Sequence, residues 1–194
     1  MPYNSAATRA RLLDAAYAEF VELGFAGARV GRIATAAAAN KQAIYAYFGS
    51  KEALFDAVLG DRLQVLADVV PFTPDDLPGY IGALFDALTD DPGLLRLTQW
   101  KALERPDASP AELEAHLAKA SALAVARGAG TEQGMDVLMV ALAAAQAWST
   151  TPEAIRNPDG AAGPARRARY RAALIRSTTA VADALLDADY STTG

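Results

Sequence analysis

Helix start and stop signals recur along the whole chain and leave little room for other secondary structure. The clearest is Ser109-Pro110-Ala111-Glu112, which places an N-cap serine, a first-turn proline and a capping-box glutamate in register. No stretch alternates apolar and polar residues while also carrying hairpin turn signals. The sequence therefore predicts an all-α protein.

Glycine, proline and capping residues divide the chain into about nine expected helices, three at the front and six larger ones behind. Asn40 and Ser50 are the expected N-caps of the third and fourth helices. A loop rich in proline, glycine and asparagine is expected at 152–164. The expected helices lie near residues 6–23, 30–37, 41–47, 51–69, 77–89, 94–103, 110–128, 131–149 and 164–187.

Charge is unevenly distributed. The net charge is −5, yet residues 1–52 carry six basic and four acidic groups, whereas the remainder carries 12 basic and 19 acidic groups. A positive N-terminal part on an acidic body can steer that end toward a polyanion. The excess permits nucleic-acid binding but does not require it.

Composition excludes several classes of protein. The chain has no cysteine, which excludes a structural disulfide, a thiolate metal site and a cysteine nucleophile. The N-terminus lacks the pattern of a secretory signal, and the longest apolar stretch, 137–148, is too short to span a bilayer. We therefore expect a soluble cytoplasmic protein.

Residues 24–59 are the most informative segment. Ile33 and Ala34 begin the apolar face of a two-turn helix, small residues follow as a tight turn, and a second short helix starts after Asn40. Two short helices joined in this way and braced by a longer one have the geometry of a helix-turn-helix. On the second helix Ile44 and Phe48 lie four residues apart and are expected to face inward. The residues expected to face outward are Lys41, Gln42, Ala43, Tyr45 and Tyr47.

This segment resembles the DNA-binding domain of the TetR family, whose pattern is I-A-x-x-A-G-V-S-x-x-x-[IL]-Y-x-[YH]-F-x-[SN]-K-E-x-L. The turn departs from that pattern, with Ala38 in place of glycine, Ala39 in place of valine and Asn40 in place of serine. A left-handed conformation at Ala38 would cost about 1–2 kcal/mol. The residues that match in register are Ile33, Ala34, Ala37, Ile44, Tyr45, Tyr47, Phe48, Ser50, Lys51, Glu52 and Leu54, with Gly24 and Phe25 upstream.

The resemblance implies a DNA-binding domain over residues 1–50 and a helical effector-binding and dimerisation domain over 51–194. Lys41 is expected to contact phosphate, Gln42 to read adenine and Ala43 to touch a thymine methyl group. Tyr45 is equally explained as a packing residue, and Lys51 beside Glu52 as an ordinary solvated helix start. The DNA contacts that the resemblance implies are Arg29, Arg32, Lys41, Gln42, Ala43, Tyr45, Tyr47 and Lys51.

The body is expected to form a dimer through its last two helices and to hold an effector pocket among its middle helices. The alternative for the dimer face is a monomeric core, and for the pocket residues it is ordinary core or surface. The expected dimer residues are Leu138, Leu142, Leu174, Ile175, Thr178, Val181 and Leu185. The residues eligible for the pocket are Gln99, Trp100, Leu103, His116, Met139, Gln146 and Trp148.

The expected function is that of a dimeric repressor that binds palindromic operator DNA and is released by a small apolar or amphipathic effector. With a single histidine, His116, and no phosphate loop, nucleophile–base pair or metal cluster, the sequence predicts no enzyme, no cofactor and no metal. Arginines 166, 167, 169 and 171 are interpreted as a solvated or salt-bridged face. The alternative is a helical small-molecule-binding or adaptor protein without sequence-specific DNA binding.

Overall fold

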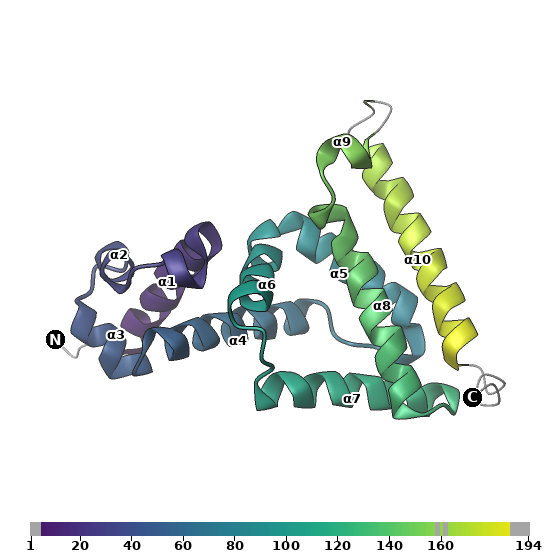
Figure 1. Cartoon of the computed structure of the whole chain (residues 1–194), viewed down its shortest axis with the longest axis horizontal. Helices are drawn as coiled ribbons and strands as arrows, with labels where there is room; N and C mark the ends of the chain where they lie inside the picture. The colour runs from purple at the N-terminus through teal and green to yellow at the C-terminus, as the bar shows by residue number, and fades with distance from the viewer. Residues whose placement is uncertain (1–4, 158–159, 161–162, 187–194) are drawn as a thin grey trace. The chain divides into compact units, whose positions relative to one another are not determined.

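The computed structural model describes residues 5–157, 160 and 163–186, and within them every regular element is helical (Figure 1). This confirms the all-α prediction. The elements are α1 (Ser5–Gly27), α2 (Val30–Ala36), α3 (Lys41–Phe48), α4 (Lys51–Val69), the 3-10 helix η1 (Pro74–Asp76), α5 (Leu77–Asp90), α6 (Pro92–Glu104), α7 (Pro110–Arg127), α8 (Thr131–Thr150), α9 (Glu153–Arg156) and α10 (Pro164–Leu186).

Ten α-helices are therefore present in the described residues, where about nine were expected. The additional helix, α9, has only four residues and lies inside the segment predicted to be a loop. The capping box at the start of α7 is confirmed, since the Ser109 side chain and the Glu112 side chain each bond the other residue's backbone amide. The expected end of the last helix, Asp187, lies outside the described residues.

The chain divides into two compact units. Unit 1 comprises Met1–Asp68 and Pro92–Asp107, and unit 2 comprises Val69–Asp91 and Ala108–Gly194. Helix α6 therefore belongs to the unit built by the N-terminal helices, although the segments on both sides of it belong to unit 2. The division at residue 50 into a DNA-binding and an effector-binding part is a division by function and stays a prediction.

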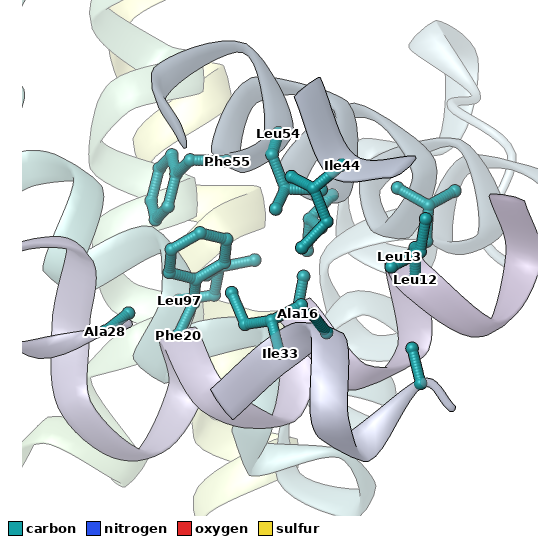
Figure 2. Packing of buried hydrophobic residues seen from close by; sticks show 13 residues of the cluster. Leu12, Leu13, Ala16, Phe20, Ala28, Ile33, Ile44, Leu54, Phe55 and Leu97 are labelled. Carbon is teal, nitrogen blue, oxygen red and sulfur yellow. The ribbon is translucent and has the colours of Figure 1, made fainter. Parts of the chain in front are cut away.

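The core of unit 1 gathers apolar side chains from α1, α2, α3, α4 and α6 (Figure 2). Phe20 and Phe55 form its aromatic centre, with ring centroids 5.0 Å apart in an edge-to-face arrangement. Ile33 and Ile44 are fully buried, so the two short helices are anchored from behind by one apolar residue each. Leu97 of α6 is also fully buried in this cluster.

Helix α1 is interrupted near its end by Gly24, whose φ of 69° and ψ of −178° lie in a region that is essentially restricted to glycine. Two residues of α6 hold this kink. The Trp100 indole donates a 3.3 Å hydrogen bond to the carbonyl of Val21, and the Glu104 carboxylate accepts a 3.0 Å hydrogen bond from the amide of Ala26. A Cβ atom at Gly24 would lie 2.9 Å from the Trp100 ring, so the glycine is required by space as well as by conformation.

Unit 2 is a helical bundle in which α5, α8 and α10 pack against one another and α7 packs along α8. Helices α7 and α8 approach closely at Gly134, where a Cβ atom would lie 2.2 Å from the carbonyl oxygen of Ala120. Phe85, Trp148 and Tyr170 form an aromatic group between the three packed helices, with centroids 5.2–6.3 Å apart. Among the described residues, none of the helices has both the length and the apolar character needed to cross a bilayer.

Candidate nucleic-acid interface

The turn between α2 and α3 closes as a Schellman motif. The amide of Ala38 bonds the carbonyl of Thr35 at 3.1 Å, and the amide of Ala39 bonds the carbonyl of Ala34 at 2.9 Å. Ala38 adopts a φ of 50°, the one positive φ at a non-glycine residue within the described part of the chain. The left-handed conformation considered for this alanine is therefore present, and it turns the chain from α2 into α3.

Side chains hold both ends of this turn. The Oδ1 atom of Asn40 accepts a 2.8 Å hydrogen bond from the amide of Ala43, which confirms Asn40 as the N-cap of α3. Arg11 of α1 donates from Nε to the carbonyl of Ala37 at 3.2 Å and from its terminal nitrogen to the hydroxyl of Thr8 at 3.2 Å. Arg11 therefore connects the turn to α1 within unit 1.

Helix α3 presents one face to the core and another to solvent. Ile44 is fully buried, and Ala43 and Tyr47 are half-buried against the core of unit 1. Lys41, Gln42 and Tyr45 are exposed, the last with 52% of its surface accessible. Tyr45 is therefore not a core residue of this unit. The helix exposes an ammonium group, an amide and a phenol on one short surface.

Glu19 of α1 organises the start of α2. Its Oε1 atom accepts hydrogen bonds from the amide of Arg29 and from Nε of Arg32, both at 2.8 Å. Burial alone would raise the pKa of Glu19, but the Arg32 and Arg29 hydrogen bonds and the charges of both arginines lower it below its ordinary value. Arg32 also donates to the carbonyl of Gly27 at 3.1 Å, so its guanidinium positions α2 as well as carrying charge. Arg29 and Arg32 are both exposed.

The two lysines predicted at the interface lie at the starts of α3 and α4. The Cε atom of Lys41 would be 2.9 Å from a Cβ atom at Gly31, so the lysine stem lies close over the first turn of α2. The Lys51 ammonium is 4.7 Å from the centroid of the Phe25 ring. The Ser50 hydroxyl accepts a 3.1 Å hydrogen bond from the amide of Ala53 and so caps α4, as predicted. Arg9 lies 5.4 Å from the Phe48 ring centroid.

The residues predicted for an effector pocket are distributed over both units. Gln99, Trp100 and Leu103 lie on α6 in unit 1, and Leu103 is 77% exposed. In unit 2, His116 lies on α7 with its Nδ1 atom 2.7 Å from the carbonyl of Glu112, and Met139, Gln146 and Trp148 lie on α8. Met139 is exposed, whereas Trp148 is buried and lines a cavity.

The residues predicted for a dimer interface lie on α8 and α10 of unit 2. Leu138, Leu174 and Thr178 are buried within the single chain, so they face its own core. The other four retain part of their surface: Leu142, Ile175, Val181 and Leu185. Met139 and Val140 are the large apolar residues that α8 exposes most.

Three residues that support this surface were not found from the sequence. Glu19 and Arg11 lie on α1, which is separated from the turn by the whole of α2. Glu104 is 78 residues from its partner Ala26. The sequence offers only a weak signal for the role of Glu19, namely an acidic residue on the helix that precedes two arginines. No sequence signal shows that Arg11 holds the turn or that Glu104 holds the end of α1, because the groups that they bond there are the backbone carbonyl of Ala37 and the backbone amide of Ala26.

Comparison with known proteins agrees with this geometry. Residues 12–58 match the family described as bacterial regulatory proteins, tetR family, and residues 76–179 match the tetracyclin repressor-like C-terminal domain. The HTH-type transcriptional repressor SCO4008 of Streptomyces coelicolor is 46% identical over 130 residues, which cover 66% of this chain and 67% of that protein.

Solved structures give the same result. The crystal structure of SCO4942 from Streptomyces coelicolor is 38% identical, with a TM-score of 0.72 over 88% of this chain and 97% of that one. A TetR-like transcriptional regulator from Rhodococcus sp. RHA1 shares the fold, with a TM-score of 0.65, 18% identity and coverage of 93% and 98%. Since TetR-family regulators are DNA-binding transcription factors, the expectation that the chain is not an enzyme is confirmed. The chain belongs to the TetR family of bacterial transcriptional regulators.

Proposed function

We propose that this chain is a repressor that binds a palindromic operator as a homodimer in the cytoplasm and leaves it when unit 2 binds a small-molecule effector. The observation that carries the DNA-binding part is the exposed face of α3, where Lys41, Gln42 and Tyr45 are accessible while Ile44 anchors the helix from behind. One helix of eight residues buries too little surface for specific binding, and two copies related by a dyad read two half-sites about 34–36 Å apart.

The side chains divide into positioning and reading groups. Lys41, at the N-terminus of α3, and Lys51, in the first turn of α4, are placed for phosphate contacts, and Arg29 adds a further exposed charge. Gln42 is the base reader, because its amide presents a donor and an acceptor together to adenine. The half-buried Ala43 and Tyr47 leave only part of their surface for contact with a base or the backbone.

The connections between the units supply the route for regulation. The chain passes between unit 1 and unit 2 at residues 68–69, 91–92 and 107–108. A ligand that rearranges α5 or α7 in unit 2 can therefore act through these connections on α4 and α6 of unit 1. Release follows when the two α3 helices of a dimer no longer match successive major grooves.

The proposal is tested by binding to the DNA that flanks the chain's own coding region, measured by fluorescence anisotropy at several salt concentrations. Gln42→Ala is expected to weaken binding to the operator by about 10- to 100-fold while leaving binding to random DNA unchanged. Lys41→Ala is expected to weaken binding to both and to reduce the salt slope by about 1, and Lys41→Arg to restore the slope.

Gln64→Ala is the matched control, because Gln64 is an exposed glutamine on α4 whose amide bonds Asp68. It should bind as the unmodified chain does. If Lys41→Ala and Gln42→Ala also bind operator like the unmodified chain, α3 is not the reading helix. Absence of any salt-sensitive affinity for DNA would instead favour a helical binding or adaptor protein.

A further inference from the structure

Unit 2 contains a cavity of about 510 Å³. Its wall residues come from the end of the bundle where α8 ends, α9 follows and α10 begins, and Figure 1 shows these three helices meeting. Its volume lies within the range of small-molecule sites. Helices α5, α8, α9 and α10 all contribute to its wall. The chemically informative wall residues are Asp86, Trp148, Glu153, Arg156, Arg167 and Arg171.

Two of the arginines in this wall are neutralised by carboxylates. Arg171 donates from Nε to Asp86 at 2.7 Å. Arg167 lies 2.9 Å from a carboxylate oxygen of Asp90 and 3.7 Å from one of Asp86. These pairs attach α10 to α5, and they agree with the interpretation of this stretch of arginines as partly salt-bridged.

Arg156 and Arg166 differ, because among the described residues neither has a carboxylate partner. Their guanidinium carbons lie 4.9 and 5.2 Å from the centroid of the Trp148 ring. Arg166 donates from Nε to the carbonyl of Arg156 at 2.9 Å, which holds the two residues together. The Nε atom of Arg156 and the Oδ1 atom of neighbouring Asn157 are buried without a hydrogen-bond partner.

This arrangement concentrates positive charge at one end of unit 2. Helix α10 begins at Pro164 with no acidic residue in its first turn, so the positive end of its dipole lies beside Arg166 and Arg167. A half-buried guanidinium is favourable when a carboxylate or another acceptor satisfies it, and the Trp148 ring offers only part of that compensation. Among the described residues, four arginines face three carboxylates, those of Asp86, Asp90 and Glu153, which leaves one positive charge in excess.

We propose that this cavity is the effector site and that it binds a small organic monoanion. The carboxylate of the ligand bonds the guanidinium of Arg156, and Arg166 contributes a second charge beside it. The apolar part of the ligand packs against Pro164, Ala168 and the accessible edge of Trp148. Asp86 and Glu153 in the wall select against dianions, because a second negative charge would meet their carboxylates. The assignment of this site as the effector site rests on the proposed function, whereas binding itself does not.

The test uses a Trp100→Phe variant, in which Trp148 is the remaining tryptophan, and follows its emission during titration with acetate, hexanoate, benzoate, benzamide and phthalate. Benzoate or hexanoate is expected to quench Trp148 to saturation, with neutral benzamide and dianionic phthalate binding at least tenfold more weakly. Calorimetry on the unmodified chain should give the same dissociation constant for the monoanion. Equal affinity for benzoate and benzamide, or no saturable binding of any monoanion, would overturn the proposal.

Arg156→Gln is expected to weaken monoanion binding by about 10- to 100-fold, because it removes a hydrogen bond between charged groups. Arg169→Gln is the matched control, since Arg169 is an exposed arginine on α10 outside the cavity wall, and it should bind as Trp100→Phe does. Unchanged binding by Arg156→Gln, with its circular dichroism and thermal midpoint also unchanged, would contradict the assignment.

Operator affinity, measured with and without the monoanion, separates the two proposals. Loss of DNA binding on addition of the monoanion supports both. Operator binding without any monoanion binding overturns the site alone. Monoanion binding that leaves operator affinity unchanged supports the site as a binding site and overturns its role as the effector site.

Discussion

Replacing Ala38 by glycine should stabilise unit 1. Ala38 holds the left-handed position of the Schellman motif at φ 50°, where an L-residue is disfavoured by about 1–2 kcal/mol. Its side chain is exposed, so the substitution removes no core packing. Against this gain, glycine destabilises the folded chain by about 0.4–1 kcal/mol, because it has more conformational freedom to lose from the unfolded chain. The expected net gain in the free energy of unfolding is therefore about 0.5–1 kcal/mol.

Urea unfolding followed by Trp100 emission measures this gain, in a Trp148→Phe background at fixed protein concentration. Trp100 lies in unit 1, so its signal reports the unit that contains the turn. Ala46→Gly is the matched control, because Ala46 is exposed inside α3, where glycine costs about 0.5–1 kcal/mol relative to alanine.

The two substitutions are the same chemical change and should have opposite signs. If Ala38→Gly lowers the midpoint as Ala46→Gly does, the turn is not strained and the reasoning from its backbone conformation fails. A gain confined to Ala38→Gly would show that the alanine at this turn makes unit 1 less stable than a glycine would.

Three further predictions concern the same unit. Gly24→Ala should lose about 1–3 kcal/mol more than Gly128→Ala in urea unfolding, because Gly128 has the left-handed α conformation that alanine can adopt at a cost, whereas Gly24 has a conformation essentially restricted to glycine and also faces the Trp100 ring; equal losses would show that neither the backbone of Gly24 nor its contact with Trp100 makes it special. The pKa of Glu19 is lowered in the folded chain, so its contribution to stability is present above the ordinary value of 4.5 and is lost as the pH falls through the folded value. The stability difference between the unmodified chain and Glu19→Gln should therefore shrink below about pH 4.5, and a difference that grows on acidification would contradict this. Asn40→Ala should cost about 1 kcal/mol in thermal unfolding, while Asn40→Ser should cost little, since serine also caps.

Local signals in the sequence predicted most of the secondary structure. Asn40, Ser50 and Ser109 each cap the helix that they were expected to cap, because capping depends on an oxygen and an amide three residues apart. Helix α9 was not predicted, since four residues carry no periodicity and its hydrogen bonds go to the carbonyls of Pro152 and Glu153. Local chemistry was sufficient for the caps but could not reveal so short a helix.

Tertiary partners were less accessible to sequence reasoning. Trp100 was considered as an effector contact, and in the structure its indole closes over Gly24 in unit 1, 76 positions away in the chain. Arginines 166, 167, 169 and 171 at the start of α10 were interpreted as a solvated or salt-bridged face. Arg167 and Arg171 pair with carboxylates and Arg169 is exposed, whereas Arg166 lies over the Trp148 ring. Charge pattern alone could not distinguish these cases, because the distinction depends on which helix packs opposite.

The position of α6 has a consequence for how this protein can be cut or recombined. Leu97 completes the core of unit 1, and Trp100 and Glu104 hold the end of α1, so a fragment that stops after α4 would expose apolar surface and leave the amide of Ala26 without its acceptor. Unit 1, which contains the proposed DNA-reading helix, is therefore not contiguous in the sequence. A chimaera that gives the DNA specificity of this chain to another regulator must include residues 92–107 together with the N-terminal helices. A proteolytic cut within α6 should impair operator binding, although α6 is far in sequence from α3, the proposed recognition helix.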